Sequence, residues 1–166
     1  MTLSFSEDTE REASLFAAIK LLSETEVEVG LPPSAGGHLT FILAIQEHGS
    51  PIMHIPPRPV IRPALSQPSV RESMAEVLVS AAESAFEGNA PAVTAAFETA
   101  GQAGADGIRH YIDAGVPPPN SPVTVSGGWI FNRVARKGVY VSGKGFNKPL
   151  FDTGALYSAF DSEVEE

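Results

Sequence analysis

The chain has 166 residues, of which 43% are hydrophobic and 19% charged, a composition typical of one globular domain with a hydrophobic core. The net charge of −9 and the lack of a dense Lys/Arg cluster argue against a protein that binds duplex DNA through a basic stripe. Without cysteine the chain has no disulfide or thiolate chemistry, and its short apolar runs predict neither a signal peptide nor a membrane span.

The first part of the chain shows helical periodicity, interrupted by one strand. The first helix is predicted to begin at a capping residue, Ser6 or Thr9, because Thr9 stands three residues before a glutamate. Polar and apolar residues alternate over residues 25–31, which indicates a short strand. The apolar run at residues 39–49 favours a short buried helix, with a strand as the alternative.

Two longer helices follow a proline-rich segment. Residues 50–63 contain five prolines, so we expect an extended segment that cannot join the centre of a sheet. A second capping box begins at Ser69 and predicts a helix that Gly88 ends. The next helix is predicted over residues 91–114, and the small residues at 100–107 would let another backbone approach it closely.

The last fifty residues are rich in β-formers separated by glycine pairs. Residues 121–128 and 138–145 are predicted as strands, and residues 159–164 as a final strand paired in a sheet. The glycines at 127–128 and 143–145 lack the spacing of a phosphate-binding loop and are interpreted as hairpin turns. The predicted fold is α+β: about three helices followed by a small, mostly antiparallel β-sheet, in a single domain with acidic termini.

The residues Asp152, Thr153 and Gly154 form a D-T-G motif like that of aspartic proteases. A protease with one such motif per chain must dimerise, because two carboxylates share the catalytic proton, and it also needs an all-β body. We therefore favour a structural role, in which Asp152 caps a short helical turn by accepting the N–H of Gly154 or Ala155. A dimeric retropepsin-like hydrolase using Asp152 is kept as an alternative function.

No cofactor or metal site is predicted. The four histidines show no pair at helical i, i+4 spacing, and no cysteine assists them. The segment "IPPRP", with Ile55, Pro56, Arg58 and Pro59, is either a polyproline ligand presented by a monomeric adaptor or a rigid crossover. The apolar residues around it favour a crossover that packs against the domain.

Two segments together resemble one family. Residues 44–65 read "AIQEHGSPIMHIPPRPVIRPAL", and the later block contains "SPVTVSGGWIFNRVARKG" and "KPLFDTGALYSAF". These are similar to the signatures of the virion-morphogenesis and minor tail-component proteins of tailed bacteriophages, which include Mu G-like tail-completion proteins. The family has His-Glu-aromatic where this chain has Gln46, Glu47 and His48, so the sequence departs from the pattern at Gln46 and His48, and also at Val60, where the family has Phe. The later block is also longer.

The resemblance implies a non-enzymatic structural protein of the phage neck or tail end, acting in tail completion, tail termination or head–tail joining. It implies a homo-oligomeric ring on the virion axis, most often of six copies, in contact with other neck and tail proteins. The protein would reside in the virion, and in the host cytoplasm during assembly.

The charge distribution leads to expectations for such a ring. An acidic lumen would let genome DNA pass without specific binding, and residues 7–12 or 163–166 are expected near it. The cations Arg133, Arg136 and Lys137 are expected at contacts between subunits or rings, where carboxylates can pair with them.

Overall fold

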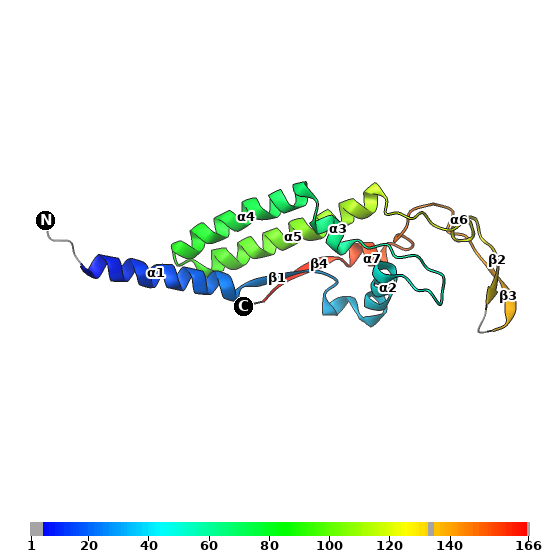
Figure 1. Cartoon of the computed structure of the whole chain (residues 1–166), viewed down its shortest axis with the longest axis horizontal. Helices are drawn as coiled ribbons and strands as arrows, with labels where there is room; N and C mark the ends of the chain where they lie inside the picture. Colours follow the sequence, from blue (N-terminus) through cyan, green and yellow to red (C-terminus); the bar gives the residue numbers. More distant parts are fainter. Residues whose placement is uncertain (1–4, 133–134, 166) are drawn as a thin grey trace. The chain divides into compact units, whose positions relative to one another are not determined.

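The computed structural model describes residues 5–132 and 135–165, without the side chains of residues 5–8. The chain folds as two compact units. Figure 1 labels the helices and strands that belong to them. Unit 1 comprises Met1–Ser34, Ile61–Ile108 and Phe160–Glu166, and unit 2 comprises Ala35–Val60 and Arg109–Ala159. The α+β class is confirmed, whereas the described residues form seven α-helices and not about three. The single-domain organisation stays a prediction.

Unit 1 is built on a layer of helices. These are α1 (Phe5–Glu24), α3 (Ile61–Leu65), α4 (Pro68–Phe86) and most of α5 (Ala90–Ala114). Helix α1 packs against α4. The core between the helices is made largely of small side chains, which allow close packing: Ala18, Ala81, Ala85, Val93 and Ala96.

Both predicted helix starts were wrong. Helix α1 already includes Phe5, so Thr9 lies inside it. Helix α4 begins at Pro68, after an N-cap Gln67 whose side chain makes no capping bond, so Ser69 lies in the first turn. The fixed φ of proline suits the first helical position and moved the start of α4 one residue upstream of the serine.

A two-stranded ribbon completes unit 1. Strand β1 (Glu26–Gly30) pairs antiparallel with β4 (Asp161–Glu165), which confirms both predicted strands and the pairing of the last one. The ribbon lies close to α5: a Cβ on Gly101 would stand 2.5 Å from the Cβ of Ser162. The small residues of α5 therefore do admit another backbone, as predicted.

Unit 2 contains three short helices and a hairpin. The helices are α2 (Gly37–His48), α6 (Pro122–Ser126) and α7 (Ala155–Ser158), and a 3-10 turn, η1 (Pro33–Ala35), precedes α2. The hairpin pairs β2 (Gly128–Asn132) with β3 (Lys137–Val141). Helix α2 confirms the helical interpretation of its segment, but only Leu43 in it is buried, so the prediction of a buried helix was wrong.

The predicted strand at residues 121–128 is instead helix α6. The Oγ of Ser121 accepts the backbone N–H of Thr124, and Pro122 occupies the first turn. These N-terminal signals outweigh the β-propensity of the valines that follow. The glycines at 143–145 do not form a hairpin turn, because the backbone N–H groups of Lys144 and Gly145 donate to carbonyls of α6.

The proline-rich segment is extended in its middle only. Residues 51–54 form a turn that is closed by an isolated bridge between Ser50 and Ile55. Residues 61–63 belong to α3, because Pro63 falls in the first turn of that short helix, where its missing N–H costs nothing.

Candidate functional site

Arg58, an interface candidate from the sequence, is an internal clamp of unit 2. Its side chain is buried, and its Nε donates to the carbonyl of Pro118 at 2.7 Å. Its Nη2 donates to the carbonyl of Pro119 at 3.0 Å, and its Nη1 to the Oε1 of Gln46 at 3.4 Å. Burial lowers the pKa of the guanidinium. Arg58 thus joins three chain segments through neutral oxygens and is not presented to a partner.

The rest of the proline-rich segment packs against helix α2. Val60 is fully buried, and its backbone N–H donates to the Oε1 of Glu47 at 2.7 Å. Ile55 is half-buried, whereas Pro56 and Pro59 are exposed. The segment is therefore a packed crossover with an exposed proline edge, which agrees with the structural interpretation of its sequence.

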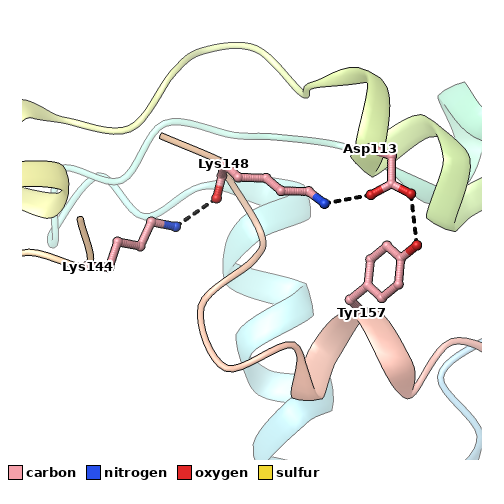
Figure 2. Close-up of polar contacts among 4 residues, drawn as sticks. All are labelled: Asp113, Lys144, Lys148 and Tyr157. Carbon is pink, nitrogen blue, oxygen red and sulfur yellow. Dashed lines mark hydrogen bonds and ion pairs between the residues drawn. The ribbon is translucent and has the colours of Figure 1, made fainter. Parts of the chain in front are cut away.

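Two lysines hold the loop that carries the D-T-G motif (Figure 2). The Nζ of Lys144 donates to the carbonyls of Lys148 and Phe151, at 2.7 and 2.5 Å. The Nζ of Lys148 forms an ion pair of 2.6 Å with the Oδ1 of Asp113, whose Oδ2 accepts the hydroxyl of Tyr157 at 2.8 Å. Sequence reasoning missed this cluster, because its members lie up to 44 residues apart.

The electrostatics of this cluster follow from its hydrogen bonds. The hydrogen bond from Lys148 lowers the pKa of Asp113 most, and the bond from Tyr157 lowers it further. The bond between Tyr157 and Asp113 also raises the pKa of the Tyr157 phenol. Burial lowers the pKa of Lys144. Lys148 also stands 4.5 Å above the ring centre of Phe151, a cation–π contact. Lys148 thus ties the loop to Asp113 of α5, while Lys144 binds two carbonyls of the loop itself.

The D-T-G motif does not form the predicted cap. The N–H of Ala155 donates to the Oγ1 of Thr153 at 3.3 Å, and within the described part of the chain Asp152 accepts no capping hydrogen bond. Gly154 adopts a left-handed conformation with φ 84°, which favours glycine. The motif is still a turn that leads into α7, as predicted, but Thr153 takes the role assigned to Asp152.

Asp152 borders a groove of about 810 Å³ in unit 2. Apolar or proline residues and polar residues line the groove in nearly equal numbers, and Arg58 and Lys144 are its arginine and lysine members. Asp152 is the only carboxylate among the lining residues that the structure describes, so a proton-sharing pair would need a second copy of the chain. No group of His, Asp and Glu suited to a metal ion occurs in the described part of the chain.

The β2–β3 hairpin carries an aromatic surface that sequence reasoning missed. Trp129 lies opposite Tyr140, so these two side chains share one face with Phe131, two residues further along β2. They are 73%, 58% and 68% exposed. The signal was present in the sequence as an aromatic at every second position of β2. We call this surface the aromatic face.

Two of the predicted contact cations lie at the hairpin end. Arg136 and Lys137 are exposed, Lys137 as the first residue of β3. Arg133 lies outside the described residues. The structure thus places two of the three cations on the hairpin that also carries the aromatic face.

Charge is divided unequally between the units. Unit 1 contains 17 Asp and Glu against 4 Lys and Arg, a net charge of −13, while unit 2 contains 3 against 7, a net charge of +4; together these give the −9 of the chain. The acidic surface of the chain is therefore a property of unit 1.

Comparisons with known proteins add no relative: no protein-family model, no curated protein and no solved structure matches this chain. Within the described ranges, no helix has the length and apolar character to cross a membrane.

Proposed function

We propose that this protein is a structural subunit of the neck or tail end of a tailed bacteriophage. Several copies, six in the arrangement that the resemblance implies, form a ring on the virion axis and contact other neck and tail proteins. Its task is tail completion, tail termination or head–tail joining, and the genome passes through the ring without specific binding.

The observation that carries this proposal is the exposed aromatic face of the hairpin. Aromatic side chains are enriched at protein interfaces, where they bury large areas. An isolated two-stranded hairpin is marginally stable in water, so a partner surface would stabilise it. An exposed hairpin that needs a partner suits a subunit whose final structure is an assembly.

The residues of the resembling segments give further support. Arg58, Lys144 and Lys148 are engaged in bonds that hold unit 2 together. This is the behaviour expected of a structural signature. Gln46, at one of the departures from the family pattern, and Glu47, which matches the pattern, also bond to the proline-rich segment.

Native mass spectrometry and electron microscopy of the purified chain test the proposal. We expect a closed ring, with about six copies, and the same ring on the axis of the assembled particle. A wild-type chain that stays monomeric over a wide range of concentration and salt would contradict it, as would an enzymatic activity that accounts for the protein without assembly.

The substitution Asp152→Asn tests the hydrolase alternative, which the exposed carboxylate at the groove favours. Because Asp152 caps nothing, we expect unfolding free energies within about 0.5 kcal/mol of wild type and an unchanged oligomer. Peptidase activity in the wild type that this substitution abolishes would favour the hydrolase. The matched variant Thr153→Val removes the bond to Ala155 and should cost more, about 1 kcal/mol.

A further inference from the structure

One face of the β1–β4 ribbon is lined with carboxylates. Glu26 stands opposite Glu165, and Glu28 opposite Glu163, and all four side chains are exposed. Like charges directly opposite one another destabilise an antiparallel pair. Among the described residues, none of the four forms an ion pair. We call this surface the glutamate face.

The hairpin of unit 2 offers the complementary chemistry. Arg136 and Lys137 are exposed at its end, Arg136 in the turn and Lys137 as the first residue of β3. Neither strand of the hairpin has a further strand partner in the described chain. The basic hairpin and the acidic ribbon therefore have opposite charges and lie on different units, whose net charges are +4 and −13.

We propose that the basic hairpin of one copy docks on the glutamate face of a second copy of this chain. This inference rests on the proposed ring and specifies its subunit contact. Contact between two different surfaces is heterologous, and heterologous contacts generate rings when the rotation closes. Contact between two hairpins would instead bring like cations together, which disfavours an isologous dimer.

The docking explains why the ribbon retains opposed glutamates. In the isolated subunit, the four carboxylates repel one another across the two strands. Cations from a neighbouring copy would offset that repulsion, so the ribbon would be more stable in the assembly than in the isolated subunit. The contact would also be sensitive to salt, because exposed charges are screened at high ionic strength.

Charge reversal on each side tests the contact. The hairpin variant carries Arg136→Glu and Lys137→Glu, and the ribbon variant carries Glu28→Lys and Glu163→Lys. The ribbon variant keeps the same like-charge opposition across the strands, so we expect it to fold as the wild type does. Analytical ultracentrifugation of each variant alone should show association weakened at least about tenfold.

The two variants are then mixed. Each reversed surface finds an oppositely charged surface on the other chain, so we expect assembly to return with alternating copies in a 1:1 ratio. Carrying all four substitutions in one chain should restore assembly in the same way. A hairpin–hairpin contact would leave the ribbon variant unaffected, which would overturn the inference.

Matched controls keep the change in charge and move it elsewhere in unit 1. Glu83→Lys with Glu87→Lys matches the ribbon variant, and Arg62→Glu with Arg71→Glu matches the hairpin variant; all four positions are exposed. Both controls should assemble as the wild type does. Circular dichroism checks folding, and Arg136→Gln with Lys137→Gln replaces the hairpin reversal if that variant does not fold.

The outcomes separate this inference from the proposed function. A ring that persists in both reversed variants overturns the docking and leaves the ring itself standing. A wild-type monomer overturns both. A monomer whose hydrodynamic radius grows with salt would show that hairpin and ribbon meet within one chain, which also overturns the inference.

Discussion

At the scale of single residues, Arg58 shows how a buried cation can be accommodated without a carboxylate. Its guanidinium spans the carbonyls of Pro118 and Pro119 and the amide oxygen of Gln46. Planar, forked donors suit such a set of acceptors, whereas a lysine ammonium is a compact point charge without that fixed planar geometry. The shape of the guanidinium therefore matters as much as its charge for holding these segments of unit 2 together.

We predict that Arg58→Ala lowers the free energy of unfolding by about 1.5–3 kcal/mol, the range for hydrogen bonds to charged groups. Arg58→Lys should recover only a part of this loss. Urea unfolding followed by circular dichroism measures both. Arg62→Ala, at an exposed position of α3, is the control and should stay within about 0.5 kcal/mol of wild type. Equal effects at both positions would contradict the clamp.

Asp113 gives the loop a sensitivity to acid. Its pKa is lowered from 3.8 in the folded protein, so its ion pair with Lys148 stabilises the fold above about pH 4 and is lost as the pH falls through the folded pKa. We predict that Asp113→Asn is less stable than wild type at pH 7 and that this difference shrinks below pH 4.

Unfolding in urea over a series of pH values tests that prediction. Tyr157→Phe is the matched variant, because it removes one of the two donors to Asp113 and should move the acid transition upward toward pH 4. A difference between Asp113→Asn and wild type that stays constant from pH 7 to pH 2 would show that the carboxylate charge has no role in stability.

At the scale of elements, the glycines of α5 set how closely the β1–β4 ribbon approaches. A Cβ on Gly101 would lie 2.5 Å from the Cβ of Ser162 and 2.7 Å from a methyl of Val27. Such distances require one of the two elements to shift. The helix thus gives up helical propensity at this position in exchange for close packing.

We predict that Gly101→Ala destabilises the protein by about 1–3 kcal/mol, the usual cost of overpacking, although alanine is the better helix former by about 1 kcal/mol. Thermal unfolding measures the effect. Gly37→Ala, at the start of α2, is the control, since a Cβ added there would meet no atom within 4 Å. That control should be neutral or slightly stabilising, and a stabilising Gly101→Ala would refute the close contact.

At the scale of the whole molecule, the two units differ in the sign of their net charge. The net charge of −13 on unit 1 disfavours contact with phosphates. In unit 2, some of the cations, such as Lys144 and Lys148, form internal hydrogen bonds or ion pairs. In the proposed ring, Glu10 and Glu12 of α1 are the acidic residues we expect nearest the DNA path. Arg136 and Lys137 should lie at subunit contacts.

We predict no binding of the assembled protein to duplex DNA at about 150 mM salt, because too few cations are available to release counterions. Fluorescence anisotropy of a labelled duplex measures this. In a map of the particle, the distance of each charged side chain from the axis gives the second measurement. Arg136 and Lys137 at the narrowest point, with the acidic residues on the outer rim, would refute the acidic lumen.

Much of the secondary structure was determined by the sequence alone. The helical period predicted α4 and α5, alternation predicted β1, β3 and β4, and Gly115, with φ 95°, ends α5 where expected. These features depend on residues within a few positions of one another, where propensity and steric limits act directly. Where local signals conflicted, as at α6, the prediction failed.

Only the tertiary structure decided what the candidate residues do. The acceptors of Arg58 lie up to 61 residues away, and Asp113 meets Tyr157 across 44 residues. No local pattern encodes such contacts, because they depend on how distant segments pack. The opposed glutamates likewise become a single surface only through the pairing of β1 with β4, which joins the first strand of the chain to its last.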